Sequence, residues 1–190
     1  MILPDMRLMT VDEFEDLLRL PENRDRNLEL IDGTIVEKAM PTEEHSLTVN
    51  LWLFYLTSWA MENEVGLPGP EHRFKVSGID NNSRQPDISM TLETDTPITI
   101  QGATLRAPDV IVEVKSPDDT ILQMRDRATW YIANGVKLVY LHFPRQQFIE
   151  AHRPGQDVEI FALSETIIGY DVLPGFSISI EKLFPRKRGG

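Results

Sequence analysis

The spacing of apolar and polar residues along this chain predicts helices and strands in alternation. Thr10 and Glu13 stand three residues apart at the start of an apolar stretch, which predicts a capping box and a short helix ending near Leu20. Thr42 can cap a second, long helix that runs to about Glu64. Apolar residues cover a wide stripe of this second helix, so we expect most of it to be buried.

The remaining apolar runs are short, bounded by turn residues, and typical of strands. Asp32 and Gly33 separate the runs at 28–31 and 34–38, which predicts a hairpin with a tight turn. Further strands are expected near residues 72–77, 86–92, 110–115, 137–142, 148–151, 157–162 and 176–180.

A strand–helix–strand pattern in the second half of the chain indicates parallel pairing. The strand at 110–115 is followed by a helical pattern over 120–133 and then by the strand at 137–142. Such a connection forms a right-handed crossover between parallel strands. The predicted fold class is therefore α/β, with a mixed β-sheet flanked by helices.

Length and composition fit one globular domain over residues 1–190, with a short basic C-terminal tail from Pro185. The chain is 41% hydrophobic and 26% charged, which is ordinary for such a domain. We expect a cytoplasmic protein without a membrane segment, because no apolar run approaches about 20 residues and no signal peptide pattern is visible. The absence of cysteine excludes disulfides and thiolate metal sites.

The net charge of −11 limits how the chain can bind nucleic acid. Sequence-independent affinity for nucleic acid depends on lysines and arginines that face phosphates, so a strongly acidic protein is a poor general duplex binder. A binding surface must be local or supplied by a partner subunit. Its candidate residues are Arg24, Arg26, Arg73, Lys75, Arg84, Arg106, Arg125 and Arg127.

The strongest chemical signal is a carboxylate and an ammonium group within an apolar strand. Glu113 and Lys115 lie two residues apart, so both point to the same face of the strand at 110–115. Burying such groups is costly unless they pair, bind a metal or take part in chemistry. This pattern suits a metal-dependent phosphodiesterase, but a salt bridge at a strand end is an equally simple explanation.

A second carboxylate is needed to hold a metal ion with Glu113, and two Pro-Asp dipeptides offer one. Asp109 lies four residues earlier on the same strand, about 13 Å away, which is too far for one shared cation. Asp87 is on a strand predicted to be a neighbour, so we favour Asp87 and assign Asp109 to the start of its strand. The alternative for Asp87 is a turn residue. Lys115 would orient or help deprotonate the attacking water.

Three further residues have both a structural and a functional interpretation. Glu29 is either a solvent-facing residue of an edge strand or a third acid. His45 lies in the first turn of the long helix, where an exposed histidine is common, and Arg127 is either a surface arginine or a phosphate ligand. The other histidines lie on isolated strands without ligand spacing and receive no role: His72, His142 and His152.

Several separated strings, taken in order, resemble the Uma family of putative restriction endonucleases, a branch of the PD-(D/E)XK nuclease superfamily. The strings cover nearly the whole chain: 9–15 (MTVDEFE), 28–33 (LELIDG), 40–45 (MPTEEH), 86–88 (PDI), 108–117 (PDVIVEVKSP), 131–136 (YIANGV) and 173–176 (LPGF).

The resemblance implies a restriction-endonuclease-like core and assigns roles by position. It implies that Glu29, Asp87, Glu113 and Lys115 are catalytic, with Asp87 and Glu113 as metal ligands, and that His45 is close to the site. Arg127 stands where many members carry a basic helix residue.

The activity expected from the resemblance is Mg²⁺- or Mn²⁺-dependent hydrolysis of DNA by a homodimeric endodeoxyribonuclease. The alternative is a catalytically silent module that keeps the fold and binds nucleic acid or protein. The net charge of −11 suggests this alternative.

Overall fold

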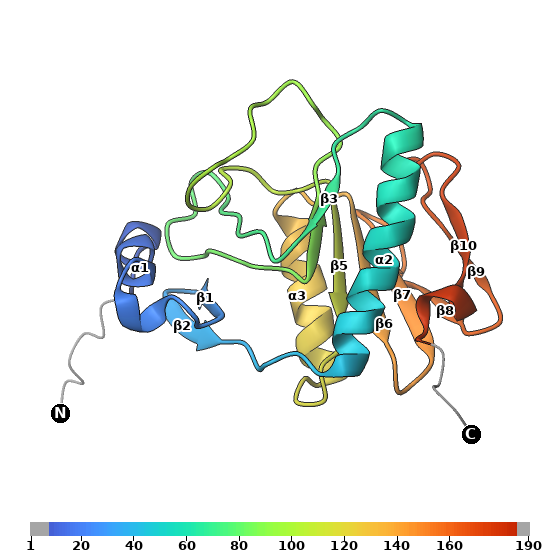
Figure 1. Cartoon of the computed structure of the whole chain (residues 1–190), viewed down its shortest axis with the longest axis horizontal. Coiled ribbons are helices and arrows are strands. Elements are labelled where there is room, and N and C mark those ends of the chain that lie inside the picture. The colour runs from blue at the N-terminus through green and yellow to red at the C-terminus, as the bar shows by residue number, and fades with distance from the viewer. Residues whose placement is uncertain (1–7, 186–190) are drawn as a thin grey trace. The chain divides into compact units, whose positions relative to one another are not determined.

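The computed structural model of the chain describes residues 8–185 (Figure 1). The predicted basic tail lies almost entirely outside the described residues, beyond Pro185. Within the described part of the chain, no helix is both long enough and apolar enough to cross a lipid bilayer.

The chain divides into two compact units, which we describe separately. The first unit contains the chain up to residue 40 together with 73–85 and 99–106. The second unit contains 41–72, 86–98 and the chain from residue 107 onward, and it holds most of the predicted site residues. The expectation of a single domain stays a prediction.

The first unit begins with the predicted capped helix, α1 (Val11–Leu18). The Thr10 hydroxyl accepts a hydrogen bond from the Glu13 amide at 3.3 Å, and the Glu13 carboxylate accepts one from the Thr10 amide at 2.9 Å. These two bonds satisfy amide groups that a helix start leaves without partners, and they confirm the capping box. A 3-10 turn, η1 (Pro21–Asn23), follows α1.

The hairpin of the first unit consists of β1 (Leu28–Ile31) and β2 (Thr34–Glu37), which pair antiparallel as predicted. Its turn residues Asp32 and Gly33 both have positive φ angles, 49° and 74°. A type I′ turn requires this conformation at both central positions, which explains the Asp-Gly sequence. The core of this unit comprises Val11, Phe14, Leu28 and Leu30.

The second unit is built on a six-stranded sheet in the order β3-β4-β5-β6-β7-β8. The strands are β3 (Pro68–Pro70), β4 (Ile88–Met90), β5 (Val110–Val114), β6 (Leu138–Phe143), β7 (Phe148–His152) and β8 (Glu159–Ala162). All neighbours pair antiparallel except β5 and β6, which are parallel and joined by α3 (Ile121–Ala133). The mixed α/β sheet and its crossover are therefore confirmed.

The two long helices of this unit cover opposite faces of the sheet (Figure 1). The helix α2 (Glu43–Glu62) packs Trp52 and Leu56 against the face that carries Val112. Because side chains alternate along β5, Glu113 points to the other face, where Tyr131 of α3 lies against it. The sheet therefore separates an apolar face from one that holds a buried carboxylate.

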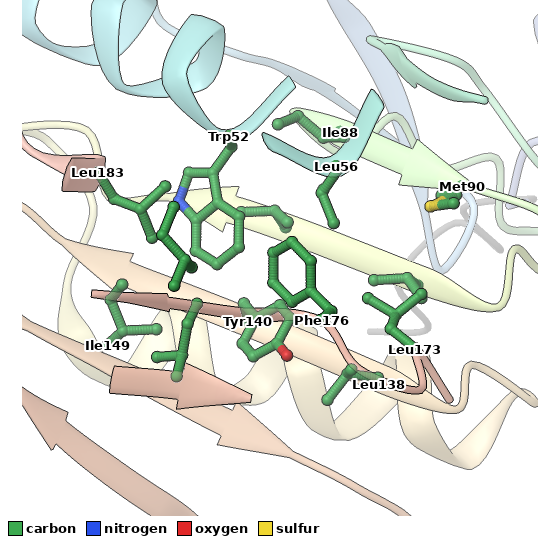
Figure 2. Packing of buried hydrophobic residues seen from close by; sticks show 14 of the residues in the cluster. Trp52, Leu56, Ile88, Met90, Leu138, Tyr140, Ile149, Leu173, Phe176 and Leu183 are labelled. Carbon is green, nitrogen blue, oxygen red and sulfur yellow. The ribbon is translucent and has the colours of Figure 1, made fainter. Parts of the chain in front are cut away.

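The main core of the second unit lies between α2 and the sheet (Figure 2). Strands β9 (Thr166–Ile168) and β10 (Ser177–Ser179) form a small antiparallel pair, and η2 (Ile180–Leu183) follows them. Their side chains complete the core. The residues labelled in the figure are Trp52, Leu56, Ile88, Met90, Leu138, Tyr140, Ile149, Leu173, Phe176 and Leu183.

Two local predictions were wrong, and two short strands were not predicted. The segment 72–77 is not a strand, because only Phe74 forms bridges, to Arg84 and Thr104. The strands that were not predicted are β3, in a stretch with two prolines, and β9. Phe54 is 63% exposed although it belongs to the apolar stripe of α2, so this helix is only partly buried.

We expect Leu56→Ala to lower the free energy of unfolding by about 2–5 kcal/mol, because it removes a fully buried side chain and leaves a cavity. Leu122→Ala makes the same change at a helical position that is 69% exposed and should cost less than about 0.5 kcal/mol. Urea unfolding followed by tryptophan fluorescence measures both values. Equal losses in the two variants would contradict the assignment of the core.

Candidate functional site

The pairing register of β4 and β5 places Asp87 next to Glu113. Ile88 pairs with Val112, so the next position along this antiparallel pair sets Asp87 opposite Glu113. The Asp87 amide donates a hydrogen bond to the Glu113 Oε2 atom at 3.3 Å. Both residues are buried, with exposures of 5% and 2%. The structure therefore brings together two acids that are distant in the sequence, Asp87 just before β4 and Glu113 within the adjacent strand β5.

The Asp87 carboxylate is held by two further groups. Its Oδ2 atom accepts a hydrogen bond from the Val114 amide at 2.8 Å and lies 3.0 Å from His45 Nε2. His45 occupies the first turn of α2, where its own amide donates to the Thr42 hydroxyl that caps the helix. The helix cap therefore positions His45 against Asp87, and the alternative of Asp87 as a simple turn residue does not describe these contacts.

The Glu113 carboxylate receives a hydrogen bond from a residue to which the sequence analysis gave no role. The Tyr131 hydroxyl donates to Glu113 Oε1 at 2.7 Å, and Tyr131 is 1% exposed. Buried tyrosines usually direct their hydroxyl to a polar partner. Tyr131 follows Arg127 by one helical turn on α3. This spacing was the only sign in the sequence that the Tyr131 side chain faces the sheet.

Lys115 lies just beyond the end of β5 and does not pair with Glu113. Its Nζ atom donates to the carbonyl oxygen of Ser116 at 2.9 Å, while its amide donates to the carbonyl oxygen of His142 at 2.9 Å. Among residues 8–185, Lys115 forms no ion pair with a carboxylate. The salt-bridge alternative is therefore wrong, and the main chain of Lys115 is fixed while its ammonium group contacts only a neutral oxygen.

His142 is a buried histidine close to this site whose environment the sequence did not predict. It is fully buried, and its Nδ1 atom accepts a hydrogen bond from Trp52 Nε1 at 3.0 Å. The indole nitrogen can only donate, so Nδ1 carries no proton. Burial lowers the pKa of the His142 imidazole to about 3, and His45 lowers this pKa further. His142 is thus neutral and serves as a packed support beneath the site.

Arg127 and Asp109 each form an ion pair outside the pair of acids. The Arg127 guanidinium pairs with Asp119 at 3.0 Å, and Asp119 also accepts a hydrogen bond from the Ser116 amide at 3.0 Å. Asp109, at the start of β5, accepts from the Leu92 amide and pairs with a lysine, as expected for a residue that fixes the beginning of a strand. A direct role for Arg127 in the site stays a prediction.

Glu29 belongs to the first unit. It is 3% exposed, and its Oε1 atom accepts a hydrogen bond from the Gln85 amide at 2.6 Å. The interpretation of Glu29 as a solvent-facing edge residue is therefore wrong. Its assignment as a third acid of the site stays a prediction.

A second buried carboxylate, Glu150, differs from the pair of acids because basic side chains surround it. Glu150 of β7 is fully buried, and it pairs with Arg125 at 2.5 Å and with His152 at 3.0 Å. Burial alone would raise the pKa of Glu150, but hydrogen bonds from His152 and Arg125 hold this pKa below its usual value. Its cationic partners make Glu150 a structural residue and a suitable control for Glu113.

The pair formed by Asp87 and Glu113 fits a hard divalent cation that needs few protein ligands. Mg²⁺ prefers oxygen ligands, keeps several waters and is commonly bound by one or two carboxylates. Within the described residues no group of three or more histidine, cysteine, aspartate or glutamate side chains is arranged to hold a metal.

Comparisons with known proteins find similarity in both sequence family and fold. The family model Uma2, described as a putative restriction endonuclease, matches residues 14–181. The crystal structure of a putative nuclease from Anabaena variabilis ATCC 29413 superposes with a TM-score of 0.78 and 26% identity, over 93% of this chain and 97% of that chain.

A cryo-electron microscopy structure of a DrdV–DNA complex is more distant. It has a TM-score of 0.34 and 17% identity, over 57% of this chain and 64% of that chain. No curated protein matches the sequence.

We expect the neutral state of His142 to make the fold sensitive to acid. The unfolded chain binds a proton at this histidine below pH 6.5, whereas the folded chain does so only near pH 3. The free energy of unfolding therefore decreases as the pH falls from 6.5 towards 3, by up to about 1.4 kcal/mol per pH unit. His142→Gln, which keeps an acceptor for Trp52, should reduce the loss between pH 7 and pH 5 by about 2 kcal/mol. Urea unfolding at both values tests this, and parallel losses in both proteins would contradict it.

Proposed function

We propose that this chain, which belongs to the Uma2 family of putative restriction endonucleases, hydrolyses DNA phosphodiester bonds with Mg²⁺ or Mn²⁺ as its cofactor. The observation that supports this proposal most directly is the proximity of two buried acids: Asp87 lies just before β4 and donates its amide to the carboxylate of Glu113 on β5. The resemblance to the Anabaena variabilis structure, itself named a putative nuclease, supports the same class of activity.

In this proposal Asp87 and Glu113 hold the cation together with a backbone carbonyl such as that of Val114. When bound, a divalent cation lowers the pKa of a coordinated water and offsets negative charge on the phosphoryl group. The donors around each carboxylate keep it in place: His45 and the Val114 amide hold Asp87, while the Tyr131 hydroxyl holds Glu113. His45 and Tyr131 are thus positioning residues.

Lys115 has a role separate from those of the metal ligands and the positioning residues. It follows Glu113 by two residues, and its ammonium group contacts only the Ser116 carbonyl, so a phosphate oxygen or a water can replace that contact without breaking an ion pair. We assign Lys115 to orienting the attacking water and to stabilising negative charge as it develops. Glu29 remains our candidate for a further acid.

DNA is the proposed substrate, and a homodimer is the proposed assembly, because one compact site cuts one strand. The net charge of −11 favours a second candidate function, a silent module that keeps the nuclease fold and binds nucleic acid or protein. A protein that binds Mn²⁺ but leaves every tested DNA uncut would support the second candidate.

We expect Glu113→Gln to abolish plasmid nicking and to weaken Mn²⁺ binding at least tenfold, because it removes one of two charged ligands and keeps the side-chain volume. Glu150→Gln changes a carboxylate that is equally buried but held by Arg125 and His152. It should lower the melting temperature yet retain nicking at 25 °C. Gel assays and calorimetric titration with Mn²⁺ measure both effects, and a Glu113→Gln variant that still nicks DNA would refute the assignment.

Lys115→Ala should separate chemistry from metal binding. We expect a loss of nicking of about 100-fold or more with nearly unchanged Mn²⁺ affinity, because Lys115 acts on the water and the phosphate, not on the cation. Lys137→Ala is the matched control, since Lys137 pairs with Asp109 at the opposite end of β5. If Lys115→Ala nicked DNA at the wild-type rate, its catalytic role would be excluded.

A further inference from the structure

The turn between β6 and β7 presents an exposed arginine on a fixed backbone. Phe143 and Phe148 close this hairpin as a strand pair, which leaves a loop of residues 144–147. The Gln147 amide donates to the Phe143 carbonyl at 2.9 Å, and Gln147 has a φ of 59°, which is uncommon for a residue other than glycine. Arg145 therefore projects from a tight turn whose conformation is set at both ends.

This turn lies against the proposed active site. A small pocket is lined by residues from the start of α2, the end of β5 and the turn itself, and it includes His45, Lys115 and Arg145. His45 lines the pocket and contacts Asp87, so the pocket is one side chain away from this carboxylate. A ligand that occupied it would touch Lys115 and Arg145 together.

Among the described residues of the second unit, most lysines and arginines are neutralised by carboxylates, but those of this pocket are not. Among the described lysines and arginines of the unit, those paired with an acid are Arg125, Arg127, Lys137 and Arg153. Lys115, Arg145 and Lys182 form no ion pair with a described carboxylate. Lys182 lines a different pocket, so the pocket next to Asp87 gathers two unpaired cations.

An unpaired guanidinium matters more in this chain than in a basic protein. With a net charge of −11, long-range attraction to a polyanion is absent, and phosphate affinity must come from cations that no carboxylate neutralises. Arginine presents a planar fork of N–H donors that matches phosphate oxygens. Arg145 can therefore bind a phosphate without first giving up an internal partner.

We infer that Arg145 binds a backbone phosphate of the nucleic acid next to the phosphodiester held at Asp87, Glu113 and Lys115. This inference rests on the proposed function and adds a substrate-anchoring residue to it. Glu44 lines the same pocket and brings the opposite charge, so it opposes phosphate binding there. The two residues should therefore have effects of opposite sign on affinity.

The test measures binding of the full chain to a fluorescein-labelled duplex of random sequence by anisotropy, in EDTA so that no cleavage occurs. We expect Arg145→Ala to bind about tenfold more weakly and to lower the slope of log affinity against log salt by about 0.9. Arg145→Lys should keep the slope and recover part of the affinity, and Glu44→Gln should bind more tightly than wild type. Lys182→Ala, which removes an unpaired cation outside the pocket, should bind like wild type.

The outcomes separate this inference from the proposed function. If Arg145→Ala bound and nicked DNA like wild type, the anchoring role would be wrong and the nuclease assignment would stand. An equal loss in Arg145→Ala and Lys182→Ala would also overturn it, because the effect would then reflect overall charge. If wild type bound no DNA with or without Mn²⁺, both the anchor and the proposed function would fail.

Discussion

The candidate site depends on the antiparallel register between β4 and β5. This register sets Asp87 opposite Glu113, so two acids separated in sequence meet at the end of two adjacent strands. A shift of β4 by one residue against β5 would turn the Asp87 side chain to the face opposite Glu113 and would separate the two acids. The buried apolar neighbours of the two acids, Ile88 and Val112, hold the register because they must stay in the core beneath α2. Hydrophobic packing beneath α2 thus determines where the two acids meet.

The elements that the sequence predicted well are those with strong local signals. The capping box at Thr10 and the turn at Asp32 and Gly33 formed as expected, because each depends on interactions within a few residues. The parallel crossover through α3 was predicted from the strand pattern, helix pattern and strand pattern that follow one another along the sequence. Strand β3 was missed because its pairing with β4 overrides the turn preference of its prolines, and the segment at 72–77 lacks a continuous partner.

The sequence predicted the two acids of the candidate site but not the residues that surround them. Glu113 was selected because a charge in an apolar strand demands an explanation, and Asp87 because it was predicted to lie on a neighbouring strand. The structure places the two together. Tyr131, His142 and Arg145 were given no role, because their importance comes from contacts across helices, strands and turns that no spacing in the sequence encodes. Family resemblance, not spacing, directed attention to His45, which contacts Asp87.

The hydrogen bond from the Val114 amide to Asp87 has a consequence for how this protein can diverge. Its donor is the main chain, and every amino acid except proline carries that group. Residue 114 can therefore drift among apolar side chains during evolution while Asp87 keeps the same anchor. An alignment of descendants would show exchange among apolar residues at position 114, and proline would be missing from that set.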